Sequence, residues 1–438
     1  MEYQFDTLAL QALYLMEKTL HNLFLTGKAG TGKSTLLHSF MRNTTKRVVV
    51  LAPTWVAALN AWWATIHSFF KFSPKSTLQS VKKAAKFAIW DPLYTEIDTI
   101  VIDEISMVRA DLFDFIDTFL QIVRENKKPF WWIQMIMIGD LFQLPPVLTN
   151  EEKVHFLQDY SSPYFFSSRA ITSRKFKFYY HELEKVYRQT DQDFISFLNK
   201  IREGNCTPED LNRFNTTIKD NHITLEPWDI YLAGKNTKVD TINQEKIMDL
   251  ATPPFSYHAI INWMVPESAY PTHAVLELKA YAQVMFVSND PDGRWVNGTL
   301  GLVTKLENET VYVQIFGGNV VKVEFYNWKI SQYFFNEETQ KLETQTVWTF
   351  KQIPLKLARA CTIHKSQGKT FDKVILDFSW WIFAHGQAYV ALSRCKSLSW
   401  LSLTKPLMMN DLIFDSSVMN FIQTAKNHSL TSLFESND

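Results

Sequence analysis

A glycine-rich segment near the N-terminus constrains the fold of this chain more than any other feature. It matches the pattern G-x-x-x-x-G-K-[S/T] and consists of Gly27, Lys28, Ala29, Gly30, Thr31, Gly32, Lys33 and Ser34. The apolar run 23–25 precedes it, and residues 36–41 follow with apolar side chains at helical spacing. A strand, a glycine loop and a helix in this order are typical of a phosphate-binding loop. The sequence therefore predicts an α/β fold built on a parallel sheet.

Each residue type in this loop has a predictable role toward a bound nucleotide. Glycines allow backbone N–H groups to turn toward phosphate oxygens, and the following helix N-terminus favours an anion. Lys33 would reach the β- and γ-phosphates, and the Ser34 hydroxyl would coordinate Mg²⁺. ATP and Mg²⁺ are therefore the predicted cofactors, bound by the loop and by Thr35. The alternative, a glycine-rich turn before an ordinary helix, is disfavoured by the strand and helix pattern on either side.

Two later strand ends carry side chains suited to phosphate chemistry. The apolar run 99–102 ends at Asp103 and Glu104, and side chains at the carboxyl ends of parallel strands face the ligand crevice. Asp103 is predicted to hold Mg²⁺ and Glu104 to orient or deprotonate the attacking water. After the run 135–138, Gln143 suits a sensor of hydrolysis, because its amide can both donate and accept. A turn glutamine before a proline is the alternative for Gln143.

Composition places bounds on the partners. With 438 residues the chain is too long for one ordinary core, so several domains are expected. Lys+Arg and Asp+Glu number 45 each, so a basic surface for nucleic acid has to be local. The candidates are residues 82–86 and 174–177, although solvated helix or loop faces are the alternative for each.

The cysteine pattern and the hydropathy indicate the compartment. Cys206, Cys361 and Cys395 lack metal-ligand spacing, and such a sparse, odd count suits a reducing environment. Neither a signal peptide nor a membrane-spanning run is recognisable. The sequence predicts a cytoplasmic protein with no membrane partner.

The periodicity of the apolar residues changes along the chain. Strand and helix patterns alternate in the first part, and period-two alternation with turn signals replaces them between about 255 and 350. The predicted domains are a first α/β core over 1–180 with an inserted element at 68–92, a second core from 181–254 and 351–407, an antiparallel β-barrel inserted at 255–350, and a tail with a terminal helix at 408–438.

Three further segments complete a recognisable set of motifs. They are residues 124–147, which run from Arg124 through a strand into Pro145 and Pro146; Ile363, His364, Lys365, Ser366, Gln367 and Gly368; and Val390, Ala391, Leu392, Ser393 and Arg394. With the phosphate loop and the acidic pair, they resemble the Pif-one/RecD-like DNA helicases of superfamily one, in the form of a minimal bacterial-type core. The resemblance extends from about residue 5 to 406 and implies two RecA-like cores that bind ATP and DNA.

The resemblance also implies roles that the residues alone do not show. Gln11 would read the adenine, Arg188 and Arg394 would act as arginine fingers, and Gly368 would lie at the nucleotide. An exposed helix glutamine and a surface helix arginine are the alternatives for Gln11 and Arg188. The residues that would contact single-stranded DNA are Pro53, Thr54, His67, Phe69, Phe70, Thr362, His364, Lys365 and Ser366. For Phe69 and Phe70, which could stack on bases, the alternative is a place in the protein core.

One departure from the family is conspicuous. Tryptophan stands where these helicases usually have glycine or another small residue, at Trp55, Trp62, Trp63, Trp131, Trp132, Trp380 and Trp381. If those backbones require a positive φ, tryptophan is strained there. Rings at positions 55–63 could also block the DNA track or stack on bases.

The motifs together predict an ATP-dependent DNA helicase. It would move 5′ to 3′ on single-stranded DNA as a monomer and unwind forked or structured duplex DNA. Two alternatives remain open: a DNA-stimulated ATPase that translocates without unwinding, and a catalytically impaired single-stranded DNA-binding protein. The expected location is the cytoplasm of a bacterial-type cell, in association with the nucleoid.

Overall fold

The computed structural model describes most of the chain, in several stretches. These are residues 5–54, 64–73, 75–173, 175–189, 191–219, 228–262, 267, 270–378 and 384–428. The chain divides into two compact units, each made from separate stretches. Unit 1 contains 1–187, 331–345 and 415–438, and unit 2 contains 188–330 and 346–414.

Unit 1 is built on a parallel sheet. Its order is β3-β2-β4-β5-β1-β6, and all its strand pairs are parallel. The strands are β1 (Asn22–Gly27), β2 (Val48–Ala52), β3 (Ala64–Thr65), β4 (Thr99–Ile102), β5 (Gln134–Ile138) and β6 (Phe178–Leu183). The strands expected from the apolar runs 23–25, 99–102 and 135–138 are thereby confirmed as β1, β4 and β5, and both sites predicted at strand ends follow strands of this sheet.

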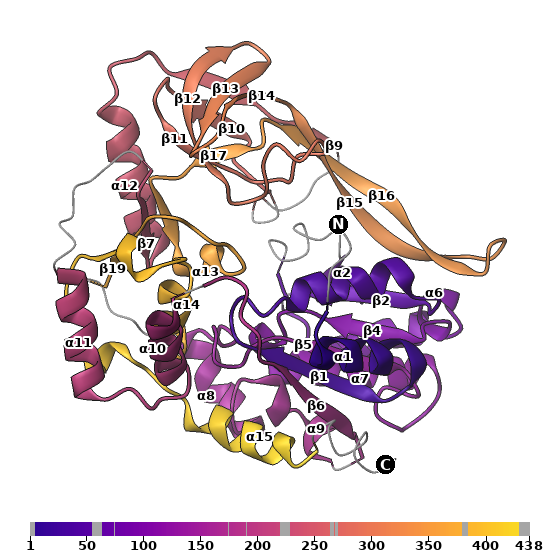
Figure 1. The fold of residues 1–438 in the computed structure, drawn as a ribbon. Helices are drawn as coiled ribbons and strands as arrows, with labels where there is room; N and C mark the ends of the chain where they lie inside the picture. Colours follow the sequence, from indigo (N-terminus) through magenta and orange to yellow (C-terminus); the bar gives the residue numbers. More distant parts are fainter. Residues whose placement is uncertain are drawn as a thin grey trace. The chain divides into compact units, whose positions relative to one another are not determined.

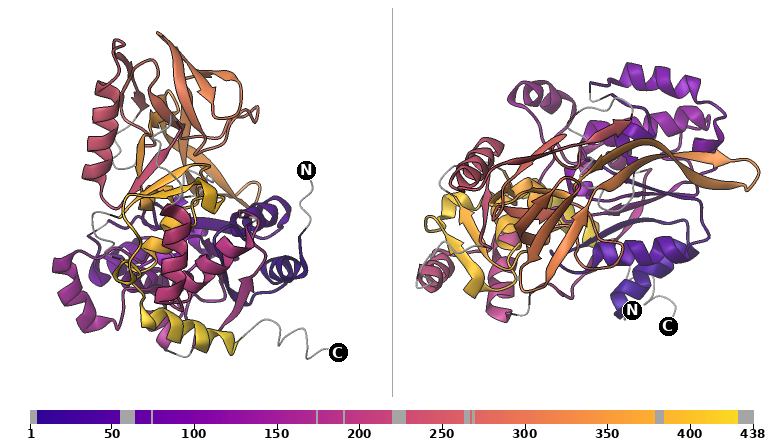
Figure 2. Two further views of the ribbon diagram at one scale, coloured as in Figure 1. Left: turned by 60° about the vertical axis from the view of Figure 1, so that its left-hand side comes forward. Right: turned by 90° about the horizontal axis from the view of Figure 1, so that it is seen from above.

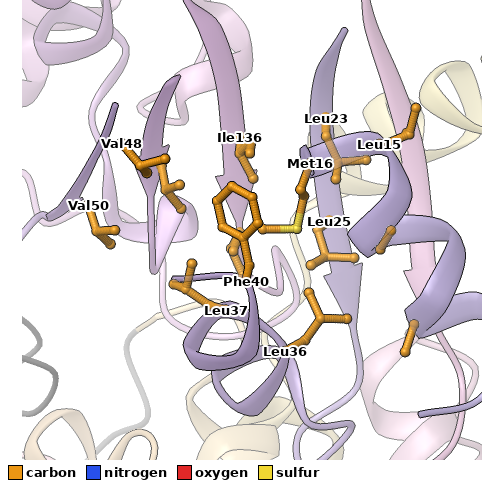
Figure 3. Packing of buried hydrophobic residues seen from close by; sticks show 14 of the residues in the cluster. Leu15, Met16, Leu23, Leu25, Leu36, Leu37, Phe40, Val48, Val50 and Ile136 are labelled. Carbon is orange, nitrogen blue, oxygen red and sulfur yellow. The ribbon is translucent and has the colours of Figure 1, made fainter. Parts of the chain in front are cut away.

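Helices cover the sheet of unit 1 (Figure 1). They are α1 (Thr7–Lys18), α2 (Lys33–Asn43), α4 (Ile66–Phe69), α5 (Leu78–Phe87), α6 (Pro92–Thr95), α7 (Ala110–Val123), α8 (Asn150–Asp159), α9 (Arg169–Thr172) and α15 (Ser416–Lys426), with 3-10 turns η1 (Ile105–Met107) and η2 (Phe165–Ser167). Leu36, Leu37 and Phe40 of α2 pack on Leu25 and Ile136 of the central strands (Figure 3). This packing fixes the start of α2, and with it the phosphate loop.

The C-terminal helix α15 belongs to unit 1. Val418, Ile422 and Ala425 are buried, and Phe421 stacks on Phe166 with ring centroids 4.4 Å apart. A terminal helix was predicted near this position, but its site of packing was not.

Unit 2 contains a second parallel sheet, ordered β18-β7-β19-β20. Its strands are β7 (Ile230–Ala233), β18 (Ala360–Thr362), β19 (Val374–Asp377) and β20 (Leu401–Leu403). The other elements are α10 (Gln192–Arg202), α11 (Pro208–Lys219), α12 (Asn236–Met248), α13 (Ile363–Ser366) and α14 (Gln387–Leu392), with 3-10 turns η4 (Leu398–Trp400) and η5 (Met409–Asp411).

A β-rich region lies within unit 2, between β7 and β18 in the chain. Five strands form one antiparallel sheet in the order β14-β13-β12-β11-β17. The strands of the region are β8 (Phe255–His258), β9 (Ile260–Asn262), β10 (Val275–Leu278), β11 (Gln283–Phe286), β12 (Leu300–Glu307), β13 (Thr310–Ile315), β14 (Val320–Glu324), β15 (Tyr326–Asn336), β16 (Lys341–Gln352) and β17 (Leu355–Leu357). The long hairpin of β15 and β16 extends away from the other strands (Figure 2), and its tip, 331–345, groups with unit 1.

Candidate nucleotide-binding site

The phosphate loop connects β1 to α2. Gly27 has a φ of +154°, and a Cβ there would lie 2.7 Å from both the Leu183 carbonyl oxygen and the Thr31 hydroxyl. Gly32 is left-handed, with a φ of 84°, and caps the N-terminus of α2. A side chain at Gly27 would therefore displace the loop, and the glycine at 32 lets it turn into a helix whose N–H groups suit phosphate.

Lys33 extends over this loop. Its Nζ donates to the carbonyl oxygens of Gly27 at 2.7 Å and Lys28 at 3.0 Å. An ammonium held at the mouth of a phosphate loop can exchange such carbonyl partners for phosphate oxygens. Ser34, the predicted Mg²⁺ ligand, is exposed at the start of the same helix.

Asp103 and Glu104 follow β4. The Asp103 backbone N–H donates to the Leu51 carbonyl at 2.9 Å, which continues the ladder to β2 by one residue. Glu104 is left-handed, with φ 52° and ψ 44°, and it begins the 3-10 turn η1. A non-glycine residue in this conformation is strained, and such strain is found most often at functional sites. The backbone conformation of Glu104 is therefore consistent with a catalytic role.

Gly139, which the sequence did not single out, supports this turn. A Cβ at Gly139 would lie 2.9 Å from Ile105 Cγ2 and 3.0 Å from the Ile105 backbone nitrogen. Only glycine at the end of β5 lets the turn after Glu104 pass this closely. Position 139 directly follows the predicted strand, but nothing local in the sequence indicates the close approach.

The electrostatics of the acidic pair favour a cation. Burial and, after it, the neighbouring Glu104 charge together raise the pKa of Asp103 to about 7, while the Lys33 charge opposes the shift. A carboxylate in such a place is stabilised when a metal supplies positive charge. Among the described residues no group of three or more His, Cys, Asp or Glu side chains could hold a metal. Mg²⁺ is commonly held by one or two protein oxygens together with substrate phosphates, so Ser34 and Asp103 suit this ion.

Gln143 is buried in the loop after β5. Its Nε2 donates to Asp140 Oδ2 at 3.3 Å, and its backbone N–H donates to the Asp140 carbonyl at 2.9 Å. The Asp140 side chain also accepts from the Phe142 N–H at 3.2 Å. The predicted sensor amide is therefore oriented by an aspartate that sequence reasoning missed.

Gln11 lies on α1. Its Oε1 is buried and has no hydrogen-bond partner among the described residues. An unsatisfied buried acceptor costs free energy unless a ligand supplies a donor, and the exocyclic amine of adenine is such a donor. This observation suits the adenine-reading role that the resemblance implied.

Tyr187 is a further candidate beside the loop. Its N–H donates to the Gly30 carbonyl at 2.9 Å, while its ring is 54% exposed and lies 3.9 Å from the Cβ position at Gly32. An exposed aromatic ring so close to a phosphate loop can contact a nucleotide. In the sequence, only its position directly before the candidate Arg188 could have indicated a role for Tyr187.

The two candidate arginines belong to unit 2, where they share a neighbourhood. Arg188 is partly buried, and its Nη1 donates to the Ser393 carbonyl at 3.4 Å. Gln189 donates to the carbonyls of Ser393 and Cys395 at 3.0 and 3.1 Å. The segment after β6 is thereby fastened to the end of α14, next to Arg394.

Arg394 itself is 1% exposed. Its guanidinium donates to the carbonyls of Val390 at 2.8 Å, Ser366 at 3.3 Å and Lys369 at 3.1 Å, and to the Ser393 hydroxyl at 2.9 Å. These bonds hold α14 against the loop that carries Gly368. Its role as an arginine finger stays a prediction and requires some of these bonds to be exchanged.

The predicted DNA-contacting residues of unit 2 surround α13. Lys365 is exposed, and burial lowers the pKa of His364. The Thr362 hydroxyl caps the helix by accepting from the Lys365 N–H at 3.2 Å, and the fully buried Ser366 donates to the Ile363 carbonyl at 2.7 Å. The capping bonds give Thr362 and Ser366 a structural role, and their contact with phosphates stays a prediction.

In unit 1, Pro53 and Thr54 follow β2 and are partly exposed, as is His67 in α4. Burial lowers the pKa of His67, which favours its neutral form. The segment between Thr54 and β3, with Trp55, Trp62 and Trp63, lies outside the described residues.

The structure buries Phe69 and Phe70, so it favours the core alternative, and their contacts with DNA bases stay a prediction. Phe69 is 4% and Phe70 0% exposed, inside a cluster of rings completed by Phe72, Tyr94, Phe115, Phe119 and Tyr333. Tyr333, from the hairpin tip, lies edge-on to Phe69 at 5.8 Å. Packing of apolar rings in a core accounts for these phenylalanines, which was the alternative.

The inserted element at 68–92 contains the helix α5, which exposes lysine side chains and an aromatic ring to solvent. Thr77 and Ser80 form a capping box that begins α5, and Val81 and Ala85 face inward. Lys82, Lys83 and Lys86 are exposed, and Phe87 at the helix end is 82% exposed. A local basic surface with an exposed ring, as DNA contact requires, is therefore present on this helix.

A phosphate loop, paired carboxylates and a glutamine at the ends of parallel strands define unit 1 as a P-loop nucleotide-binding domain. Residues 8–212 match the family described as PIF1-like helicase. The ATP-dependent DNA helicase Pif1 of Campylobacter jejuni is 30% identical over 93% of this chain and 96% of its own. The chain therefore belongs to the Pif1-like helicases, a family of ATP-dependent DNA helicases.

Other relatives agree, although some are longer. ATP-dependent DNA helicase PIF1 of Rattus norvegicus is 33% identical over 92% of this chain, which spans 62% of that protein. A crystal structure of Bacteroides Pif1 with ADP-AlF4 is 33% identical, has a TM-score of 0.87 and is matched over 98% of this chain and 99% of that one. The same protein with single-stranded DNA matches at 33% identity with a TM-score of 0.68, over 97% and 98% of the two chains. The fold is accordingly that of a helicase with two RecA-like cores.

Proposed function

We propose that this protein is an ATP-dependent DNA helicase that moves 5′ to 3′ on single-stranded DNA and unwinds duplex DNA. The observation that carries the proposal is the arrangement of Lys33, Asp103 and Gln143 at the ends of adjacent parallel strands, in a chain whose relatives are named DNA helicases. Single-stranded DNA and forked or structured duplexes are the proposed partners.

The residues of unit 1 suit successive parts of ATP hydrolysis. The loop N–H groups and Lys33 would bind the phosphates, with Gln11 at the adenine. Bound Mg²⁺, held by Ser34 and Asp103, would supply positive charge to the phosphate oxygens. Glu104, fixed by its strained turn, would orient the attacking water. Gln143, held by Asp140, would respond to the loss of the γ-phosphate.

The arginines of unit 2 would supply the remaining charge. Charge on a transferring phosphoryl group needs a fixed cation. We propose Arg188 and Arg394 for this role, with Arg394 also joining α14 to the loop at Gly368. Loss of the γ-phosphate would then change the position of Arg394 and of the loop that carries Gly368. Because His364 and Lys365 lie in the helix just before this loop, hydrolysis in unit 1 would change how strongly they bind DNA.

Contacts with DNA would be to the backbone and to exposed rings. Lys82, Lys83, Lys86 and Phe87 of α5 are suited to the point where the strands of a duplex part. Because such contacts carry no base-edge readout, binding should be sequence-tolerant and weakened by salt. We propose that the protein acts as a monomer in the bacterial cytoplasm, at the nucleoid.

ATP hydrolysis with and without single-stranded DNA, on this chain and its Glu104→Gln variant, tests the proposal. Turnover stimulated by DNA and lost in the variant supports a motor. Stimulated turnover without duplex unwinding would favour the translocase alternative. Tight nucleotide and DNA binding without turnover would favour the binding-only alternative.

A further inference from the structure

Four tryptophans adopt a backbone conformation that tryptophan avoids. Their φ angles are +67° at Trp90, +39° at Trp131, +54° at Trp132 and +92° at Trp228. For a bulky L-residue a positive φ is a genuine outlier, because its Cβ meets the backbone. Glycine adopts these angles without strain.

Chance does not account for this concentration. Ten non-glycine residues of the described part have a positive φ, and four of them are tryptophans. Tryptophan contributes only 14 of 438 residues, about 3%. Asn and Asp, which tolerate the left-handed region best, are absent from those ten.

At two of these positions, Trp90 and Trp132, the surroundings of the side chain offer little in return for the strain, whereas the Trp228 ring lies against Phe316 with centroids 5.3 Å apart. Trp90 and Trp132 are 73% and 66% exposed. The Trp132 ring is covered by the Lys128 ammonium at 4.9 Å and by the edge of Trp131. Contacts of this kind at a surface are weak, so the indoles do not explain why the chain turns as it does here.

Other tryptophans of the same chain behave as packed aromatic residues. Trp295 is 7% exposed, stacks on Phe286 at 4.5 Å and lies under the Arg294 guanidinium. Trp328 is 5% exposed, with the ring of Tyr326 at 4.9 Å. Neither has a positive φ. The tryptophans of the described residues thus include two different populations.

We propose that positions 90, 131, 132 and 228 are glycine sites, and that the polypeptide made in the source organism carries glycine there. The triplet UGA is read as tryptophan in one variant genetic code and as glycine in another. A gene that uses UGA for glycine gives this chain when it is translated by the tryptophan code. The low glycine content, 13 of 438 or about 3%, against roughly 7% in ordinary proteins, has the same explanation.

The proposal extends to the sequence positions where a small residue was expected. Trp55, Trp62, Trp63, Trp380 and Trp381, which lie outside the described residues, would also be glycine. Trp295 and Trp328 would remain tryptophan, encoded by UGG, because their rings fill space in the β-rich region.

The gene and the native protein test this directly. We expect UGA at codons 90, 131, 132 and 228, and UGG at 295 and 328. Peptide mass spectrometry of the protein purified from its source organism should show the mass of glycine at the four sites. UGG at the four codons would overturn the proposal, and so would UGA codons whose peptides have the mass of tryptophan.

A stability measurement on the recombinant chain tests the glycine sites themselves. The double variant W131G/W132G should raise Tm by at least about 2 °C because it relieves backbone strain. The matched W131A/W132A variant also removes both rings but keeps a Cβ at a positive φ, so its Tm should lie below that of the glycine variant. W328G should lower Tm. Equal Tm values for the glycine and alanine pairs, or a lower Tm for the glycine pair, would contradict the proposal.

Discussion

Replacement of Gly139 by alanine is a direct test of how the acidic turn is built. The added Cβ would lie 2.9 Å from Ile105 Cγ2 and 3.0 Å from the Ile105 backbone nitrogen. The backbone atom cannot rotate away, so the turn after Glu104 has to shift. Overpacking of this kind costs about 1–3 kcal/mol, which corresponds to a fall in Tm of about 2–10 °C for a domain of this size.

The same shift should slow hydrolysis more than it weakens nucleotide binding. Because the carboxylate of Glu104 is held by this turn, a displacement of about 1 Å would lower kcat by as much as about 100-fold, while the phosphate loop stays in place. Thermal unfolding and steady-state ATP hydrolysis with single-stranded DNA measure the two effects. Gly318→Ala is the matched control, since its nearest neighbours, atoms of Ile315, lie at 3.4 Å. Wild-type Tm and kcat for Gly139→Ala would refute the reasoning.

Perturbations at Asp103, at Phe70 and at the two arginines separate further roles. The affinity for Mg²⁺-nucleotide should fall about tenfold per pH unit below pH 7, because protonation of Asp103 competes with the metal. Titration calorimetry at several pH values measures this dependence, which should be lost in the Asp103→Asn variant. The raised pKa also predicts that the free protein loses stability as pH rises from 3.8 to about 7, since the folded state binds the Asp103 proton more tightly; a rise in the urea midpoint over that window would argue against it. Phe70→Leu should lower the free energy of unfolding by about 1–2 kcal/mol through lost ring packing without changing affinity for single-stranded DNA, whereas weaker DNA binding would restore the base-contact role. Arg188→Ala should reduce DNA-stimulated turnover about 10³-fold at a nearly unchanged Tm. Arg394→Lys should lower the Tm as well as the turnover, because it removes the hydrogen bonds between α14 and the loop at Gly368. Equal Tm values for the two variants would count against the structural role of Arg394.

The sequence predicted the parts of the site whose chemistry is local. A phosphate loop needs glycine, lysine and a hydroxyl at fixed spacing, and Asp103 is placed by the strand before it. These positions follow from a few consecutive residues. The parallel strands β1 and β4, which lie on either side of β5, were therefore predictable with the residues that follow them.

Features that depend on distant packing were not predictable in the same way. The run of phenylalanines at 69–72 could face DNA or the core, and the partners that bury it, such as Tyr94 and Tyr333, lie up to hundreds of residues away. Likewise, the packing of Phe421 on unit 1 depends on Phe166. The close approach of Gly139 to Ile105 depends on how two strand ends meet.

The strand-separating activity can be measured directly with tailed duplexes. The protein, ATP and Mg²⁺ are incubated with a labelled duplex that carries a single-stranded tail on the 5′ or the 3′ side, and release of the labelled strand is followed. We expect unwinding of the 5′-tailed and forked substrates that is lost in Glu104→Gln, with little release of strand from the 3′-tailed duplex. Unwinding of the 3′-tailed duplex, or ATP hydrolysis with no strand release from either, would contradict this expectation.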